Sequence, residues 1–366
     1  MNGWERNVRR VEPYVPGEQP KESNVIKLNT NENPYPPAPG VRAAIEAVEP
    51  DTYRLYPDPD ATVLTEALAD AYGVSPEQVF VGVGSDDVLA MCFLTFFNGE
   101  KPVLFPDITY SFYDVWTELF GIPYARVPLD DDFHIRAADY KKENGGIIFP
   151  NPNAPTGVEE PQEMIIEILE ANPDSVVIID EAYVDFGAKS VLPLIDTYEN
   201  LLVVQTMSKS RSMAGARIGW AFGSAKLIGY LKDVKFSFNS YTMSRMALAA
   251  GTAALADRAY FDRTRSRIIE TREQTKLALR ALGFSFPDSK SNFIFATHAS
   301  CPAKELFDAL KEQRIYVRYF DKPRIDNYIR ITVGTDAQMR TFLDFLKKYL
   351  NNRQNINMTR TGQEQI

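Results

Sequence analysis

Short apolar runs and amphipathic segments alternate through the first two-thirds of the chain. Between the runs, apolar residues recur with helical spacing at 60–72, 87–97 and 161–172. The runs themselves consist mainly of valine, isoleucine, leucine and phenylalanine, which is typical of strands buried on both faces of a mostly parallel sheet. This alternation predicts a doubly wound α/β domain whose ligands bind at the carboxyl ends of the strands. The predicted strands cover residues 78–84, 101–106, 145–152, 175–183 and 201–207.

The pattern changes after about residue 255. A long helix is predicted over about 257–282, ending at Gly283. Shorter strands and helices follow, which indicates a small α+β unit. We therefore expect four parts: an N-terminal arm (1–40), a large domain (41–255), a small domain (256–350) and a tail (351–366). The tail is polar and lacks an apolar face, so we expect it to be disordered.

Composition and charge narrow the class of function. The chain has 366 residues and a net charge of −9, which argues against a general nucleic-acid or membrane-surface binder. Its N-terminus lacks the apolar core of a signal peptide, and no run is long enough to span a bilayer. Cys92 and Cys301 show no CxxC spacing, so we expect reduced thiols and a cytoplasmic protein. His134 and His298 are isolated, which argues against a histidine-based metal site or a Ser–His–Asp hydrolase.

Polar residues follow several of the predicted strands. "GVGSDD" at 82–87 opens a helix, where backbone amides form either an anion site or an ordinary turn. It lacks the third glycine of the dinucleotide fingerprint, which disfavours a nucleotide-binding dehydrogenase. Asp180 ends one strand and Lys209 follows another. Together these turns fit an aromatic, phosphorylated cofactor that carries an aldehyde, because an amine can bond to the aldehyde and a carboxylate can hold a protonated ring nitrogen.

The order and spacing of these motifs resemble the fold-type I pyridoxal-phosphate aminotransferases. Within that group the chain is most similar to the histidinol-phosphate aminotransferase family, and "NVRRVEPYVPGEQ" and "IKLNTNENPYPP" near the start strengthen this similarity. The resemblance covers about residues 7–350. It rests on "RLYPDP", "GVGSDD", "DITYSFY", "NPNAPTG", "DEAYVDF", "SKSRSMAGARIG" and "RITVGT".

The resemblance implies a role for each matching residue. Lys209 would form the Schiff base with pyridoxal 5'-phosphate, Asp180 would hold the pyridine nitrogen, and Tyr183 would bond to the phenolic oxygen. Tyr110 would stack on the ring, and Asn153 would also bind the cofactor. The cofactor's phosphate would meet the backbone amides of Ser85 and Asp86 and the side chains of Thr206, Ser208 and Arg217.

The resemblance also implies a homodimer and two anionic substrates. Tyr56 would reach the phosphate in the neighbouring subunit, so the active sites would be shared. Arg330 would bind the carboxylate of glutamate, and Arg318 would help to bind the phosphate of the second substrate. Tyr14 would close over the cavity, and Asn33 would contact substrate. The implied reaction moves an amino group between glutamate or 2-oxoglutarate and L-histidinol phosphate or imidazole-acetol phosphate, in histidine biosynthesis.

The sequence departs from the family's pattern at two positions, and three alternatives to the implied function stay open. Ala154 stands where the family commonly has an asparagine that bonds to the phenolic oxygen, and Arg211 is an extra charge for which we expect a surface or inter-subunit role. An aromatic aminotransferase or a threonine-phosphate decarboxylase would share the cofactor residues. A non-catalytic effector module of the same fold would need a DNA-binding region, and neither terminus is basic enough or resembles helix-turn-helix.

Overall fold

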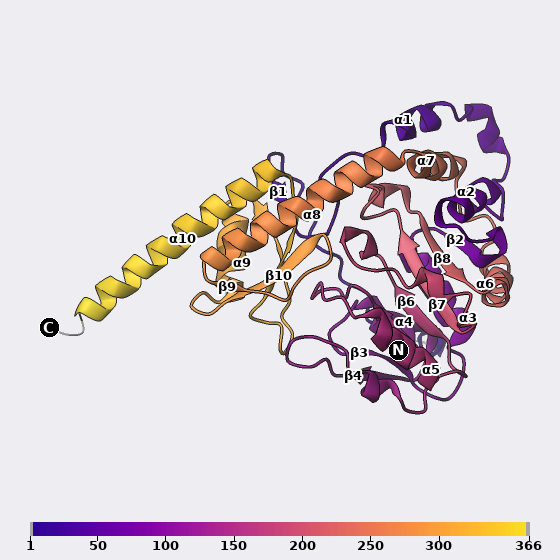
Figure 1. Ribbon diagram of the computed structural model, residues 1–366, viewed down its shortest axis with the longest axis horizontal. Coiled ribbons are helices and arrows are strands. Elements are labelled where there is room, and N and C mark those ends of the chain that lie inside the picture. The colour runs from indigo at the N-terminus through magenta and orange to yellow at the C-terminus, as the bar shows by residue number, and fades with distance from the viewer. Residues whose placement is uncertain (1–2, 364–366) are drawn as a thin grey trace.

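The computed structural model describes residues 3–363, and it divides into a large α/β part and a smaller α+β part joined by one long helix (Figure 1). Among these residues no helix is long and apolar enough to cross a membrane. The large part is built on a seven-stranded sheet in the order β2-β8-β7-β6-β5-β3-β4. β8 runs opposite to the other six strands, which share one direction, so the prediction of a mostly parallel sheet is confirmed. The strands are β2 (Val79–Gly82), β3 (Val103–Pro106), β4 (Tyr124–Val127), β5 (Gly146–Pro150), β6 (Val177–Asp180), β7 (Leu201–Thr206) and β8 (Gly219–Gly223).

Helices cover both faces of this sheet. Alternate side chains of each strand point to opposite faces: Val177 and Ile179 of β6 pack into one apolar cluster, and Ile178 packs into the other. The first cluster is completed by α1 (Pro39–Glu46), α2 (Thr62–Tyr72), α5 (Gln162–Ala171) and α7 (Arg245–Ala256). The second is completed by α3 (Ser85–Phe96), α4 (Phe112–Phe120) and α6 (Ala225–Phe238).

The small part follows the long helix α8 (Arg258–Ala281), which crosses from the large part to the small one (Figure 1). Asp257 caps its first turn by accepting a hydrogen bond from the backbone N–H of Tyr260, and Gly283 follows its end with a φ of +86°. The end predicted at Gly283 is thus confirmed, while the domain boundaries at residues 40 and 255 stay predictions. The other elements are β9 (Phe284–Ser285), β10 (Phe293–His298), α9 (Ala303–Glu312), β11 (Ile315–Tyr316), β12 (Arg318–Tyr319), β13 (Ile329–Thr332) and α10 (Asp336–Gln363).

The last helix covers most of the predicted tail. Residues 351–363 belong to α10, whose end projects beyond the small part (Figure 1), and the expected disorder of 351–366 stays a prediction. Phe342, Leu346 and Leu350 anchor the start of α10 in an apolar cluster. Once a helix is nucleated, each further residue adds a backbone hydrogen bond at little cost, so a polar sequence can continue it. Residues 364–366 lie outside the described range.

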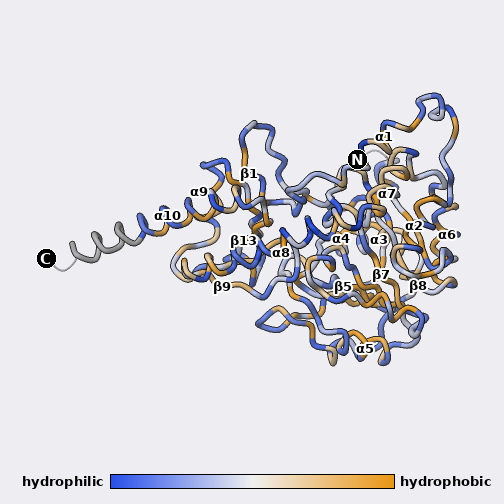
Figure 2. The backbone as a smooth tube through the Cα atoms, turned by 45° about the horizontal axis from the view of Figure 1, so that its top comes forward, coloured by the Kyte–Doolittle hydropathy of each residue, from blue (hydrophilic) through white to orange (hydrophobic). Residues whose placement is uncertain are grey.

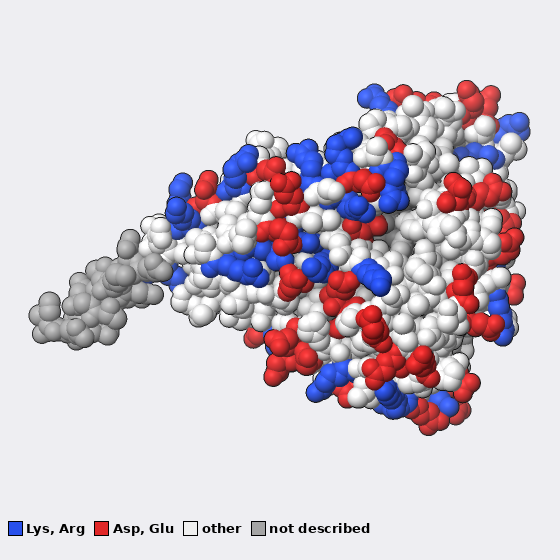
Figure 3. All heavy atoms as spheres, in the orientation of Figure 1, with Lys and Arg blue, Asp and Glu red and all other residues white. Residues whose placement is uncertain are grey.

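The N-terminal arm ties the two parts together. Its strand β1 (Ile26–Lys27) pairs in parallel with β11 of the small part, and the arm then runs to α1 of the large part. Apolar segments are concentrated in the sheet, and hydrophilic segments lie along α8 (Figure 2). Lys and Arg are interspersed with Asp and Glu on the face drawn in Figure 3, so the net charge of −9 is not gathered there in one patch.

Candidate active site

A cavity of about 160 Å³ lies where the arm, the large part and the small part meet. It is at the carboxyl ends of the parallel strands, where open α/β sheets bind ligands. Larger hollows occur elsewhere, such as one of about 470 Å³ beside Phe133 and Phe286, but the predicted residues do not line it. Of the predicted site residues, those that line the smaller cavity are Tyr14, Tyr110, Tyr183, Lys209, Arg318 and Arg330.

Asp180 is the last residue of β6 and is almost fully buried. Its carboxylate accepts hydrogen bonds from the hydroxyl of Tyr113 at 3.1 Å and from the backbone N–H of Ala182 at 3.2 Å. Burial raises its pKa from the ordinary 3.8 to about 6, although these hydrogen bonds oppose the rise. No Lys or Arg among residues 3–363 forms an ion pair with it. A buried carboxylate of this kind is suited to receive a cationic ligand group.

Lys209 lies in the loop between β7 and β8. Its Nζ is 5.7 Å from the centre of the Tyr183 ring and has no hydrogen-bond or ion-pair partner in the described part of the chain. The backbone carbonyl of Lys209 accepts a hydrogen bond from the side-chain amide of Asn33 at 3.0 Å. The amine is therefore presented to the cavity with its backbone held in place.

Asn33 does not line the cavity. Its side chain lies behind the lysine, where it also donates to the carbonyl of Ser210 at 3.1 Å and accepts from the backbone N–H of Tyr35 at 3.0 Å. The expected direct contact between Asn33 and substrate is therefore not what this geometry shows. The asparagine two residues earlier, Asn31, does line the cavity and donates to the hydroxyl of Tyr183 at 2.9 Å.

The start of α3 lies next to β8. A Cβ on Gly219 would come within 2.3 Å of the backbone nitrogen of Ser85, and one on Gly84 would come within 2.5 Å of Nη2 of Arg217. Glycine is thus required at position 219, where backbone meets backbone, and a φ of +87° favours it at position 84. The first N–H groups of a helix have no partner within it, so this cradle offers unpaired donors beside a guanidinium.

The remaining members of the expected phosphate site surround this cradle. Arg217 forms an ion pair with Asp86 at 3.0 Å, and the other oxygen of that carboxylate accepts from the hydroxyl of Tyr110 at 2.8 Å. Thr206 and Ser208 are buried, with their hydroxyl oxygens 3.0 Å apart. Thr206 pairs with Gly219 in the register of β7 and β8, which brings Thr206 close to the start of α3.

Asn153 is turned away from the cavity. Its amide donates to the carbonyl of Ile108 and to the hydroxyl of Thr156, both at 3.0 Å, and thereby holds the turn that follows β5. Asn153 is not among the residues that line the cavity, and its binding to the cofactor stays a prediction. Ala154 does line the wall, and it packs in one apolar cluster with Tyr183.

Tyr56 does not line the cavity of its own chain. Its side chain is 76% exposed and stacks on Tyr241 with ring centres 4.6 Å apart. Leu55 and Phe238 are also large exposed apolar residues of these two neighbouring segments. Such a patch is typical of an interaction surface.

Two arginines of the small part line the cavity and have no acidic partner among residues 3–363. Arg330 on β13 donates to the backbone carbonyl of Asn29 at 3.1 Å, and its Nε has no partner; burial lowers its pKa. Arg318 on β12 lies 5.6 Å from the ring centre of Phe320. Neither arginine pairs with Asp321 or Asp326. Both guanidinium groups therefore remain available to anions.

Arg211 does not have the expected surface or inter-subunit position. It is buried, donates to the backbone carbonyl of Ala254 at 3.2 Å and lies 4.1 Å above the ring of Phe261. It binds the loop after Lys209 to α7 and α8. The charge is tolerated inside because a guanidinium can stack on an aromatic ring.

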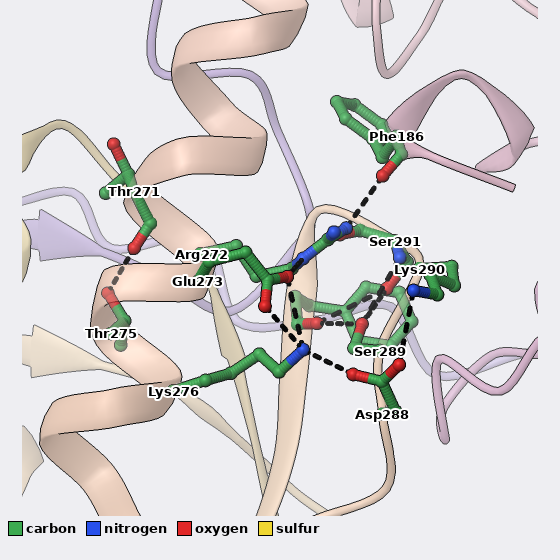
Figure 4. Close-up of polar contacts among 11 residues, drawn as sticks. Phe186, Thr271, Arg272, Glu273, Thr275, Lys276, Asp288, Ser289, Lys290 and Ser291 are labelled. Atoms are coloured by element: carbon green, nitrogen blue, oxygen red, sulfur yellow. Dashed lines mark hydrogen bonds and ion pairs between the residues drawn. The ribbon is translucent and has the colours of Figure 1, made fainter.

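A polar cluster on α8 supports the turn that follows Tyr183 (Figure 4). Arg272 is buried and donates at 2.8 Å to the carbonyls of Phe186 and of Ser291. One turn further along α8, Lys276 pairs with Glu273 at 2.8 Å and also with Asp288. The helix that joins the two parts is thereby fixed to the strand end that carries Asp180 and Tyr183.

This fold and this cavity define a class, the fold-type I pyridoxal-phosphate-dependent transferases. The sequence model of the family "Aminotransferase class I and II" matches residues 23–346. Among solved structures, the histidinol-phosphate aminotransferase from Clostridium acetobutylicum has a TM-score of 0.83 with 21% identity, over 90% of this chain and 100% of that one. The enzyme from Sinorhizobium meliloti, solved in complex with pyridoxal-5'-phosphate, has a TM-score of 0.81 with 25% identity, over 89% of this chain and 91% of that one.

The chain belongs to the histidinol-phosphate aminotransferase family. It is 53% identical to the histidinol-phosphate aminotransferase of Acinetobacter baylyi over 96% of this chain and 98% of that protein. It is 55% identical to histidinol-phosphate aminotransferase 1 of Bordetella parapertussis over 94% of this chain and 98% of that protein. The family membership predicted from the motifs is confirmed.

Proposed function

We propose that this protein is a transaminase that moves an amino group between glutamate and imidazole-acetol phosphate, giving L-histidinol phosphate for histidine biosynthesis. The observation that carries the proposal is the pair Arg318 and Arg330, which enter the cavity of Lys209 without carboxylate partners. Glutamate and the phosphorylated ketone are both anions. A planar guanidinium binds carboxylate or phosphate through two parallel hydrogen bonds.

The residues present fit pyridoxal 5'-phosphate. At the cavity, Lys209 offers an amine without a partner among residues 3–363; beside it, next to Tyr110 and Tyr113, lie a buried carboxylate that no cation of this range pairs and a glycine-lined helix start close to Arg217. These suit the aldehyde, the pyridine nitrogen and the phosphate of that cofactor. When bound, the cofactor supplies an electron sink for bond breaking at the α-carbon of the substrate.

Two residues would carry the proton and charge chemistry. Nζ of Lys209 would anchor the cofactor and then take the proton from the α-carbon of the substrate and return it, because it faces the cavity without a competing partner. Asp180 would keep the ring nitrogen protonated. Its burial makes an unpaired negative charge costly, so a cation at this point is strongly favoured.

The other cavity residues would orient the reactants. The hydroxyl of Tyr183 would donate to the phenolic oxygen, and the ring of Tyr110 would stack on the cofactor, with its own hydroxyl held by Asp86. Arg330 would bind the substrate carboxylate and Arg318 the substrate phosphate. Tyr14 stacks on Phe112 at 4.1 Å at the edge of the cavity and would close it against water.

We further propose a homodimer in which Tyr56 reaches the cofactor phosphate of the partner. Tyr56 has no role in its own cavity, and it stands in the exposed apolar patch with Leu55, Phe238 and Tyr241. A two-fold contact through this patch would bury it. We place the enzyme in the cytoplasm, since its two cysteines are unpaired and buried, as is usual in a reducing compartment.

The test is a substrate panel measured with the holoenzyme. Imidazole-acetol phosphate, phenylpyruvate and L-threonine phosphate are each offered, the two ketones with glutamate as donor. We expect efficient amination of imidazole-acetol phosphate, weak amination of phenylpyruvate and no release of carbon dioxide from threonine phosphate. Preferred turnover of phenylpyruvate would identify an aromatic aminotransferase instead.

A further inference from the structure

The hydroxyl of Tyr183 has one hydrogen-bond partner among the described residues, the side-chain amide of Asn31. The distance from Nδ2 of Asn31 to the tyrosine oxygen is 2.9 Å, and both side chains are buried. Asn31 comes from the N-terminal arm, 152 positions before Tyr183 in the chain. The contact therefore exists only once the arm is in place across the cavity.

The orientation of the Asn31 amide is fixed by Thr332. The threonine hydroxyl accepts from the backbone N–H of Asn31 at 3.0 Å, so its own proton is directed to Oδ1 of Asn31, also at 3.0 Å. Because Oδ1 is thereby the acceptor, the NH₂ group is the one that faces Tyr183. The backbone carbonyl of Asn31 accepts from Asn292 at 2.9 Å, and the residue has a φ of +56°, in the left-handed region that asparagine tolerates.

This fixed amide decides where the proton of Tyr183 points. Since the tyrosine oxygen accepts from Asn31, its own O–H is left to donate toward the cavity that Tyr183 and Lys209 line. The turn after β5 contributes no free side-chain amide to the cavity, because Ala154 has none and the amide of Asn153 donates to the carbonyl of Ile108 and the hydroxyl of Thr156.

We propose that Asn31 is a positioning residue that aims the hydroxyl proton of Tyr183 at the phenolic oxygen of the cofactor, and so supplies the polar support that position 154 lacks. Thr332 is the second member of this device. It lies on β13, two residues after Arg330, so the strand that would bind the substrate carboxylate also holds the amide. This inference rests on the proposed cofactor, and it links Asn31, Thr332 and Tyr183 in one device.

A donated hydrogen bond stabilises the anionic form of the phenolic oxygen. Losing it should therefore raise the pKa at which the visible absorbance of the bound cofactor titrates. Asn31→Asp nearly keeps the shape but places an oxygen opposite Tyr183, which then accepts the tyrosine proton and withdraws it from the cofactor. Asn31→Ala only removes the amide. A lost hydrogen bond of ordinary strength predicts a rise of roughly 0.4–1 pH unit, with the larger value for Asn31→Asp.

The experiment titrates the visible absorbance of holoenzymes from about pH 5 to pH 10. The variants are Asn31→Asp, Asn31→Ala, Thr332→Val, Tyr183→Phe and the double variant Asn31→Asp/Tyr183→Phe. We expect the three changes at Asn31 and Thr332 to raise the titration midpoint, and Asn31→Asp to add little once Tyr183 is phenylalanine. Ala154→Asn, placed in the Asn31→Ala background, should lower the midpoint again, because it returns an amide to the cavity wall.

The outcomes distinguish the positioning role of Asn31 from the proposed function. If the wild type shows a titrating cofactor band and Tyr183→Phe shifts it, but Asn31→Asp and Thr332→Val titrate like the wild type, the positioning role is refuted and the proposed function stands. If the wild type binds pyridoxal phosphate with no titrating band, the proposed function fails and this inference fails with it. Should Asn31→Ala fail to fold, Asn31→Asp and Thr332→Val still decide the question.

Discussion

Replacing Asp180 by asparagine should change how the stability of the cofactor-free protein depends on pH. The carboxyl has a pKa of about 6 in the folded chain and an ordinary value of 3.8, because burial disfavours its charged form. Between these values the folded state binds more protons than the unfolded state. The free energy of unfolding must then fall as the pH rises through this window.

The size of the effect follows from the two pKa values. A rise from 3.8 to about 6 corresponds to a loss of roughly 3 kcal/mol of stability above pH 6, of which about half develops between pH 5 and pH 7. Asparagine is neutral and has no such dependence. Its oxygen can still accept from the N–H of Ala182, and its NH₂ can donate to the hydroxyl of Tyr113. The packing of the site should therefore survive.

The assay is urea unfolding of both cofactor-free proteins at a series of pH values from about 5 to about 8. Glu181 is also buried, with a pKa raised to about 7, and it adds a slope of the same sign to both proteins. The difference between them isolates Asp180. We expect the wild type to lose about 1–2 kcal/mol more than Asp180→Asn between pH 5 and pH 7. Parallel stability curves would show that Asp180 is not the strained carboxylate described here.

Other changes at the site have equally definite outcomes. Lys209→Ala should abolish turnover, together with the cofactor band that borohydride bleaches in the wild type. The cofactor-free variant should unfold at nearly the same temperature as the cofactor-free wild type. Full turnover in the variant would exclude the lysine from the chemistry. Arg318→Ala should weaken mainly the binding of the phosphorylated substrate, by roughly 1.5–3 kcal/mol, or about 10- to 150-fold. Arg330→Ala should weaken the binding of both substrates. Equal losses for glutamate and the phosphorylated substrate in Arg318→Ala would show that Arg318 does not bind the phosphate. Inactive Lys209→Ala and Tyr56→Ala proteins, refolded together, should regain about a quarter of wild-type activity, because a mixed dimer with shared sites keeps one intact site; no recovery would mean that the sites are not shared.

Much of the fold could be predicted because buried parallel strands have an unmistakable composition. The strands β2, β3, β5, β6 and β7 all fall within the predicted apolar runs. Two strands of the same sheet were missed. Residues 124–127 of β4 form a short edge strand with an exposed Arg126, and β8 begins and ends with glycine, so neither has the continuous apolar run that indicates a buried strand.

Some site residues could be predicted because they lie at the end of a strand or in the loop directly after it. Asp180 ends a strand and Lys209 follows one, so the sheet alone brings both to one edge. Asn31 was missed because its place depends on a contact between the arm and β13, 301 positions apart. The run "NTNEN" offered three asparagines; Asn29 and Asn31 both line the cavity, and only the folded arm, with its left-handed turn at Asn31, shows which amide bonds to Tyr183. Spacing along the sequence cannot decide that.

Two opposite charges near the cavity have no ion-pair partner among residues 3–363: Asp180, which is buried, and Arg330, which is half-buried. Asp180 lies on the large part with no cation paired to it, and Arg330 lies on the small part with only a backbone carbonyl as acceptor. The two charges do not pair with each other: Asp180 ends β6 of the large part, whereas Arg330 lies on β13 of the small part and lines the cavity. Each burial costs stability until a ligand supplies the missing opposite charge. A ligand that is cationic at its ring nitrogen and a substrate that is anionic at its carboxylate would together relieve both. Binding energy from both sides of the cavity would then favour the arrangement in which the two parts close on the reacting atoms.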